Sequence, residues 1–299
     1  MEGDHGTRIG TIAAVTVSLI WGLSFVAARM VLSTLTPVLL ATVRFVIASA
    51  IFTLFIVKDR MRGSELESGD LRKLAVLGVL SISVYFWLQY TGVMYAGAGV
   101  SALLVVGLIP VLTGFMSTIV LKERTGARKY LGTGMGLAGV ALITVPNLLV
   151  SDVDWKFYVG VAFLLLNAAC WAIYSTLSRR LMKRIGRPVL VTAYVTVFGT
   201  LALIPLSLTS NWGLLYQLNS QQWTSVLYLA LVCSGLGYFL WNFALLRLEA
   251  VKAAVWLYLE PVAAFAGEAL ILGVMPSLTT VLGGVAILVG AILTSRSDE

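Results

Sequence analysis

The sequence predicts an all-α integral membrane protein with ten transmembrane helices, arranged as two inverted repeats of five helices each. Three observations lead to this fold class. Of the 299 residues, 59% are hydrophobic and only 12% are charged, whereas soluble domains carry about 25% charged residues. Ten apolar runs are each long enough for a helix to cross the hydrocarbon core of a bilayer. The two halves of the chain also share identical residues at a fixed offset.

The apolar runs define the expected spans. They lie near 9–32, 37–57, 73–95, 99–121, 128–147, 157–179, 188–208, 222–246, 251–273 and 277–295. The first run is longer than the apolar core of a secretory signal, and only Arg8 gives it a basic lead, so we expect it to be retained.

Basic residues gather in every second connection between these spans. They are Lys58, Arg60, Arg62, Arg72, Lys73; Lys122, Arg124, Arg128, Lys129; Arg179, Arg180, Lys183, Arg184, Arg187; and Arg247, Lys252. The alternate connections carry only Lys156. Because basic loops stay on the cytoplasmic side, we expect a multi-pass protein of the inner (plasma) membrane with both termini cytoplasmic. The net charge of +7 then reflects lipid headgroups and topology, and no nucleic-acid partner is expected.

The offset between the halves is 151 residues over most of the chain. It places Pro110 on Pro261 and Gly132 on Gly283, and a shift of 150 places Trp21 on Trp171. The predicted repeats are residues 1–147 and 148–299. Since each has an odd number of spans, the second lies upside down relative to the first. Inverted repeats of this kind are an architecture of secondary transporters that work by alternating access.

Few ionisable side chains fall within the spans. Glu260 and Glu268 are the acids, and Arg29 and Arg44 are the bases. A charge at the centre of a membrane helix costs about 2.5–3.5 kcal/mol. Glu260 therefore forms a structural ion pair, is protonated and bonded to a neighbouring helix, or contacts a substrate or proton. The arginines either extend to the outer interface or hold a substrate carboxylate.

Polar and aromatic residues recur at helical spacing, as in Ser81, Tyr85 and Gln89, which share a face. Core packing or an interfacial aromatic belt explains any one of them. As a set they predict an aromatic-walled cavity with one acid, which suits a zwitterion with an apolar side chain. The predicted substrate-binding residues are Trp21, Tyr85, Gln89, Asn167, Trp171, Tyr174, Asn242, Trp256 and Glu260.

Two prolines and a set of glycines predict how the helices move and pack. Pro110 and Pro261 lack an N–H and stand at equivalent points, so we expect paired hinges. Glycines near 132–139 and 283–290 allow close helix approach, either within the bundle or at a dimer face.

An enzyme is not expected. Intramembrane proteases need a Ser–His pair, an Asp pair or a zinc motif, but the only histidine is His5 in the polar N-terminal tail, and no Asp lies mid-span. Cys170 and Cys233 lie in apolar runs as core residues, so neither a metal site nor a cofactor is predicted.

Motifs in several spans carry a resemblance to a known family. They are "LIWGLSFV", "VRF", "YAGAGVSALLVVGLIPVLTGF", "CWAIYSTLSRRL" and "LRLEAVKAAVWLYLEPVAA". In this ordered set the chain resembles an EamA-type member of the drug/metabolite transporter superfamily, over all ten spans. The resemblance implies export or exchange of small metabolites, and a subgroup of the YddG type exports aromatic and neutral amino acids.

The sequence departs from the family pattern at one point. Relatives often have Gly-Glu after the ninth span, but Val274 follows Gly273 here, while Glu123 holds the corresponding place in the first half. An exchanger of phosphorylated metabolites or nucleotide sugars is the alternative function. A polyanion would need several bases in the cavity, and only Arg29 and Arg44 are candidates, so we favour amino-acid export.

Overall fold

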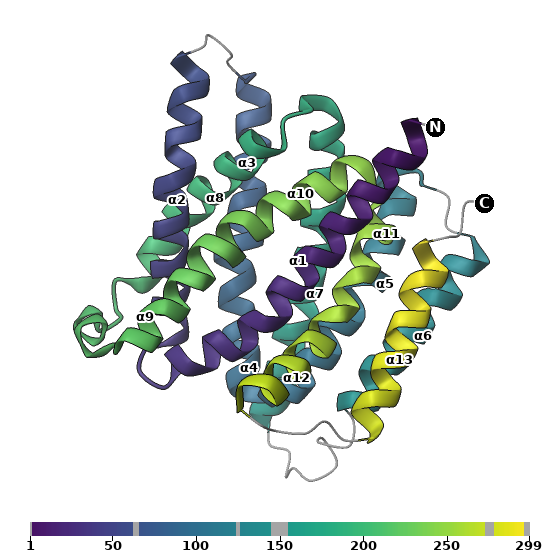
Figure 1. Cartoon of the computed structure of the whole chain (residues 1–299). Coiled ribbons are helices and arrows are strands. Elements are labelled where there is room, and N and C mark those ends of the chain that lie inside the picture. The colour runs from purple at the N-terminus through teal and green to yellow at the C-terminus, as the bar shows by residue number, and fades with distance from the viewer. Residues whose placement is uncertain (1, 62–65, 124–125, 145–154, 273–277, 296–299) are drawn as a thin grey trace.

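The computed structural model describes residues 2–61, 66–123, 126–144, 155–272 and 278–295 (Figure 1). Throughout these residues the regular structure is helical. The segments include π-helical turns (η1, η2, η3, η6) and 3-10 turns (η5, η7). In chain order they are α1 (Glu2–Leu32), α2 (Pro37–Met61), α3 (Ser68–Gly78), η1 (Val79–Val84), α4 (Tyr85–Ser101), η2 (Ala102–Val106), α5 (Gly107–Met116), η3 (Ser117–Leu121), α6 (Ala127–Thr144), α7 (Trp155–Ile185), α8 (Pro188–Ser207), η5 (Trp212–Gln217), α9 (Ser220–Leu227), η6 (Tyr228–Gly237), α10 (Tyr238–Arg247), α11 (Ala250–Ala254), η7 (Val255–Tyr258), α12 (Leu259–Leu272) and α13 (Leu278–Ser295).

Within the described residues, seven helices are long and apolar enough to cross a membrane, and a shorter apolar helix covers Val281–Thr294. Two of the seven, α2 and α8, begin at Pro37 and Pro188, where the missing proline N–H costs nothing. Asn219 precedes α9 and exchanges hydrogen bonds with Gln222 in a capping box, which satisfies donors at the helix start.

The third and fourth expected spans correspond to two separate apolar candidates, Ser68–Ala96 and Leu104–Leu121, but the connection between them is itself helical. Helical structure continues from Ser68 to Leu121 through α3, η1, α4, η2, α5 and η3. Helical and π-helical turns carry the chain across the region of the glycines at 97 and 99, where the apolar runs predicted a connection. The eighth and ninth spans are composite, since η6 interrupts the former and η7 the latter.

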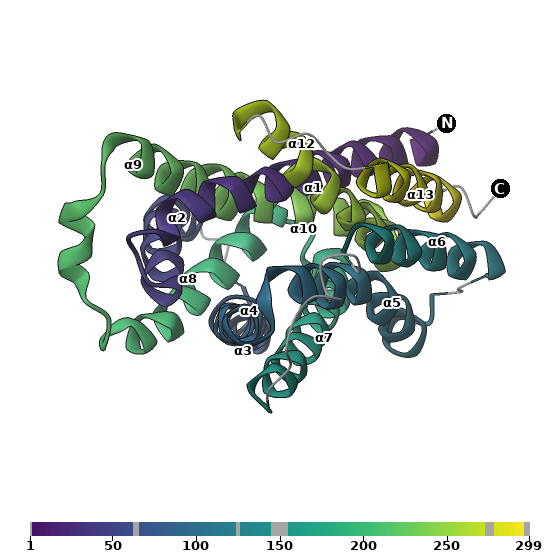
Figure 2. The same cartoon turned by 90° about the horizontal axis from the view of Figure 1, so that it is seen from below.

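The helices form a bundle in which segments distant in sequence lie side by side. The start of α1 and the end of α13 lie on the same side, at the right of Figure 1. Helices α6 and α13 run antiparallel along one edge, and α2 and α8 pack together on the opposite side (Figures 1 and 2). Helix α1 crosses in front and packs against α10 and α12.

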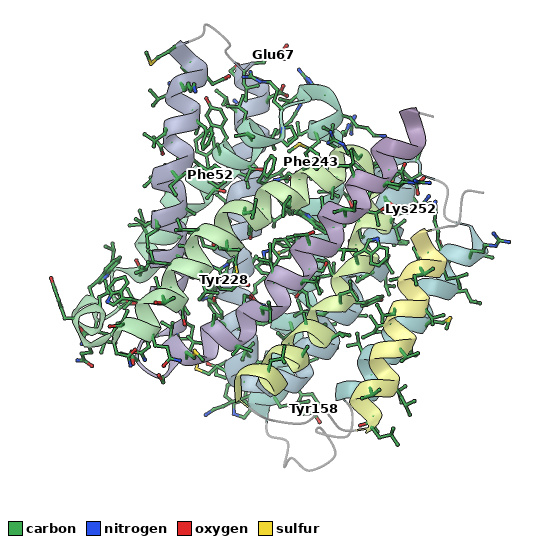
Figure 3. All side chains as sticks on the ribbon, viewed as in Figure 1. Phe52, Glu67, Tyr158, Tyr228, Phe243 and Lys252 are labelled. Atoms are coloured by element: carbon green, nitrogen blue, oxygen red, sulfur yellow. The ribbon has the colours of Figure 1, made fainter. Side chains whose placement is uncertain are left out.

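The four basic connections meet at one end of the bundle through ion pairs. Arg187 pairs with Asp59, and Arg184 pairs with Glu67, which ties the connection before α8 to the one before α3. Two further pairs at this end are Arg179–Glu123 and, at 2.5 Å, Lys129–Glu249. Figure 3 shows Glu67 and Lys252 at this end and Tyr158 at the other. Opposite charges on neighbouring loops therefore hold these connections together.

Several contacts join positions that are related by the repeat offset. The side-chain oxygens of Ser49 and Thr200, which are 151 residues apart, lie 2.7 Å from each other. The Tyr258 hydroxyl donates to the carbonyl of Gly107 at 3.0 Å, again across 151 residues. Contacts between equivalent positions arise when two similar units face each other across a two-fold axis.

The glycines of α6 and α13 belong to the same pattern. A Cβ on Gly132 would lie 2.5 Å from the carbonyl oxygen of Gly290, and one on Gly139 would lie 2.6 Å from that of Gly283. The two contacts are equivalent by the repeat offset of 151 residues. Gly132 corresponds to Gly283 and Gly139 to Gly290, so the offset turns one contact into the other. The glycines therefore serve close packing within the bundle.

Candidate functional site

An aromatic cluster lies at the centre of the bundle. Trp171 of α7 is its hub, with ring centroids 5.3 Å from Trp21, 5.1 Å from Tyr85 and 5.9 Å from Trp241. Tyr238 joins from α10, 5.8 Å from Trp171. These rings are buried, so Trp21, Tyr85 and Trp171, which were predicted from separate spans, do come together. The rings pack directly against one another.

Hydrogen bonds from ring substituents and an amide fix the cluster. The Trp21 Nε1–H donates to the carbonyl of Cys233 at 3.0 Å, and the Tyr238 hydroxyl donates to that of Ser81 at 3.2 Å. The Asn167 Nδ2–H donates to the carbonyl of Tyr85 at 2.6 Å. Cys233 and Ser81 lie in the π-helical turns η6 and η1. Such turns are frequent at functional sites, and here they supply main-chain acceptors to the cluster.

Other polar atoms of the cluster have no partner among the described residues. They are Trp171 Nε1, Trp241 Nε1, Ser81 Oγ and Asn167 Oδ1, and all four atoms are buried. A buried donor or acceptor that is left unsatisfied costs about 1–3 kcal/mol. The cluster therefore offers both donors and an acceptor to a polar group that enters it.

Glu260 stands beside this cluster on α12. Its backbone packs against Gly22, since a Cβ there would lie 2.5 Å from the Glu260 carbonyl oxygen, and Gly22 follows Trp21 of the cluster. The side chain is half-buried, and within the described residues its carboxylate takes part in no ion pair or hydrogen bond. Among the described residues, therefore, Glu260 does not form the structural ion pair that was one of the interpretations from sequence.

Arg44, for which the sequence left open the outer interface or a substrate carboxylate, borders the same cluster. Its side chain is only 6% exposed, and its Nε–H donates to Ser234 Oγ at 2.8 Å. The guanidinium carbon lies 5.2 Å from the ring centroid of Phe45 and 5.4 Å from that of Phe86. Extension to the outer interface is therefore wrong for Arg44. The position of Arg44, eight residues into α2, suggested that it lies at the membrane interface. The adjacent aromatic residue Phe45 was the feature that could have indicated a buried guanidinium.

The remaining predicted residues differ in how far the protein already engages them. Asn242 accepts from Tyr174 and Ser178 and donates to Thr192, so packing between α7, α8 and α10 uses its amide fully. Gln89 on α4 is half-buried. Trp256 is buried in η7, and its Nε1 has no partner among the described residues. The side chains of Arg29 and Glu268 lie outside the described part of the structure.

The two prolines sit at changes of helix geometry. Pro110 lies inside α5, which follows directly after the π-helical turn η2. Pro261 is the third residue of α12, and the 3-10 turn η7 precedes that helix. The missing N–H at each proline thus coincides with a stretch where the α-helical hydrogen-bond pattern already changes.

A separate cavity of about 300 Å³ opens on the side of the bundle between α2, α8 and η6. Apolar side chains line it, among them Phe52, Phe55 and Phe239. It shares no residue with the aromatic cluster and suits contact with lipid tails.

Comparison with known proteins gives the family. The model of the EamA-like transporter family matches residues 8–145 and, a second time, residues 158–296. An uncharacterized transporter of Archaeoglobus fulgidus is 29% identical over 285 residues, which cover 95% of this chain and 98% of that protein. The Bacillus subtilis transporter YyaM is 28% identical over 93% of this chain and 90% of its own length.

Two more distant similarities agree with this. The Escherichia coli inner membrane protein YtfF is 24% identical and aligns with 96% of this chain and 95% of its own length. A solved crystal structure with 22% identity superposes with a TM-score of 0.79 over 97% of this chain and 96% of that chain, which supports the fold alone. The chain belongs to the EamA-like transporter family, and it is a multi-pass membrane transporter.

Proposed function

We propose that this transporter exports small metabolites, with neutral or aromatic amino acids as its substrates, by alternating access. The observation that carries the proposal is Glu260. A carboxylate in the middle of a membrane span costs about 2.5–3.5 kcal/mol, and the described residues provide no partner that would offset this cost. A cation that binds to Glu260 and leaves again during transport explains both the presence of the carboxylate and its lack of a fixed partner. The ammonium group of an amino acid is such a cation.

The aromatic cluster supports the rest of the substrate assignment. Trp21, Tyr85 and Trp171 offer apolar faces for a bulky side chain, and an ammonium group is also attracted to such faces. The buried unpaired atoms of Trp171 and Asn167 offer hydrogen bonds to a polar backbone. A nucleotide sugar or phosphate ester would instead need several cations at this place, and Arg44 is the base that borders the cluster.

The proposed architecture is ten helices in two inverted repeats, residues 1–147 and 148–299. Seven of the ten are the long apolar helices. The other three would be α6, α13 and the composite span of α11, η7 and α12. The contacts between Ser49 and Thr200 and between Gly107 and Tyr258 support a two-fold relation. The end where the basic connections meet would face the cytoplasm together with both termini, in the inner (plasma) membrane.

Exchange in proteoliposomes tests the substrate class. Purified protein would be reconstituted with unlabelled substrate inside, and uptake of labelled phenylalanine, leucine, a hexose phosphate and a nucleotide sugar would be compared. We expect saturable exchange of the amino acids and none of the phosphorylated compounds. Exchange of a phosphorylated compound without any amino acid would replace this function by the alternative.

A further inference from the structure

We propose that Arg44 is the binding site for the carboxylate of the transported molecule, and that it makes the carrier select amino acids over the corresponding amines. This inference rests on the proposed function, and it adds an anion site to the cation site at Glu260. The observation behind it is a buried guanidinium that has no carboxylate partner in the described part of the chain.

The surroundings of Arg44 orient it without neutralising it. Ser234 Oγ in η6 accepts a hydrogen bond from the Nε–H at 2.8 Å. The ring centroids of Phe45 and Phe86 lie 5.2 and 5.4 Å from the guanidinium carbon. Contact with aromatic faces stabilises a cation, and the Ser234 hydroxyl that accepts from Arg44 is uncharged.

Arg44 therefore keeps donors for a further partner. A guanidinium carries five N–H donors in a fixed planar fork, and the bond to Ser234 engages one of them. A planar fork of N–H groups is the arrangement that holds a carboxylate through two parallel bonds. A bound carboxylate would supply both the missing acceptors and the missing negative charge.

No acid of the described residues neutralises Arg44. The ion pairs described above lie at the end of the bundle where the basic connections meet, as in Arg179–Glu123 and Lys129–Glu249. A buried arginine without a counter-charge is rare in a membrane bundle, and such residues commonly mark substrate pathways. Were packing its only task, an apolar side chain between Phe45 and Phe86 would serve better.

Arg44 and Glu260 flank the same part of the aromatic cluster. Both charges interact electrostatically with Tyr85 and with Cys233. Two adjacent residues of η6 connect the two sides. The Cys233 carbonyl accepts from Trp21, whose neighbour Gly22 packs on Glu260. The Ser234 hydroxyl accepts from Arg44. A substrate whose apolar side chain lies against the cluster therefore has a cation site and an anion site within reach of one surface. That pair of sites fits a zwitterion.

Three related compounds separate the contributions of the charged groups. Phenylalanine has both groups, phenethylamine lacks the carboxylate, and 3-phenylpropionate lacks the ammonium. We would measure phenylalanine exchange in proteoliposomes, inhibition by the other two compounds, and thermal stabilisation of the purified protein by 3-phenylpropionate. The variants are Arg44→Gln, Arg44→Lys and, as control, Arg184→Gln, since Arg184 is half-exposed at the basic end.

The inference predicts that Arg44→Gln weakens phenylalanine exchange by about tenfold to a hundredfold, the expected loss for a charge-assisted hydrogen bond. Inhibition by phenethylamine should stay as in the parent. Arg44→Lys should keep more exchange than Arg44→Gln, and Arg184→Gln should match the parent. Exchange of phenylalanine by folded Arg44→Gln at the parental rate would overturn the inference.

Two further outcomes keep the test decisive. If the parent protein exchanges no amino acid, the proposed function fails. Stabilisation by 3-phenylpropionate in the parent but not in Arg44→Gln would still support an anion site. If Arg44→Gln does not fold, Ser234→Ala decides, because it removes only the bond to Nε: we expect a raised KM for phenylalanine with little change in maximal rate, and an unchanged KM contradicts the inference.

Discussion

The side-chain oxygens of Ser49 and Thr200 lie 2.7 Å apart although 151 residues separate them in the chain. The same offset superposes Pro110 on Pro261 and Gly132 on Gly283. A residue that touches its own equivalent lies next to the axis that relates two similar units. The contact thus supports a local two-fold axis between α2 and α8, and the pairing of α6 with α13 extends it to the edge of the bundle.

The glycine contacts between α6 and α13 can be tested with a matched pair of variants. Gly132→Ala places a methyl group 2.5 Å from the carbonyl oxygen of Gly290, so we expect a loss of about 1–3 kcal/mol in the free energy of unfolding. At Gly134, two residues away, a methyl group would meet nothing within 4 Å. Gly134→Ala should be neutral or slightly stabilising, since alanine favours a helix by up to about 1 kcal/mol.

Thermal unfolding in detergent measures both variants. Equal stability of Gly132→Ala and Gly134→Ala would mean that α6 and α13 are not packed as closely as described.

The orientation in the membrane is tested by cysteine labelling. Ser68, at the start of α3, and Gln217, at the end of η5, are both exposed. The two native cysteines are buried and give little background. We expect Gln217→Cys to react with an impermeant maleimide in intact cells, and Ser68→Cys to react only after the membrane is opened. Labelling of both positions from the same side would refute the topology.

Much of this fold can be predicted from the sequence because hydropathy and charge act over whole segments. The apolar runs, the alternation of basic connections and the offset between Pro37 and Pro188 are all properties of many residues together. That the connection between the third and fourth spans is itself helical could not be predicted. Whether glycines such as Gly97 and Gly99 end a helix depends on packing from other segments, and packing is not encoded locally.

The buried ion pair between Arg179 and Glu123 should stabilise this conformation. Their side chains are 6% and 9% exposed; Arg179 also donates to the carbonyl of Leu245, and Glu123 accepts from the N–H of Ala250. Together they join η3, α7 and the turn between α10 and α11. Glu123→Gln leaves a buried cation unpaired, so we expect a loss approaching about 3–5 kcal/mol in stability.

The exposed pair Arg184–Glu67 provides the comparison. Their side chains are 50% and 75% exposed, and a pair in water contributes about 0–1 kcal/mol. Glu67→Gln should therefore unfold at nearly the parental temperature. If Glu123→Gln and Glu67→Gln have the same melting temperature, the buried pair does not hold this end of the bundle together.

The proline in the ninth span should affect rate more than selectivity. Pro261→Ala restores an N–H near the 3-10 turn η7, which favours a regular helix and opposes bending there. We expect slower exchange with the same order of preference among amino acids. Pro110→Ala in α5 is the matched variant, because Pro110 occupies the equivalent position. A change in substrate preference without a change in rate would place Pro261 in the binding site instead of a hinge.

The candidate site is harder to predict than the fold. Aromatic residues such as Trp21 and Trp171 can be assigned to one cluster because polar and aromatic residues recur at helical spacing in their spans. The role of Asn242 as a packing residue cannot, since its partners Tyr174 and Thr192 come from two other helices. The position of Arg44 is hidden for a related reason: depth within a span does not reveal whether a side chain faces the lipid or the bundle interior.

The central claim is that the Glu260 carboxylate acts on the transported molecule. The direct measurement is phenylalanine exchange by Glu260→Gln in proteoliposomes, from about pH 5 to pH 8, with Glu67→Gln as the exposed control. The amide keeps the shape of the side chain and loses the titratable charge. We predict that the variant inserts and folds like the parent but exchanges phenylalanine at least about tenfold more slowly or with an altered pH dependence, as loss of a charge-assisted hydrogen bond requires. Exchange at the parental rate over the whole range would contradict the account and make Glu260 a structural residue.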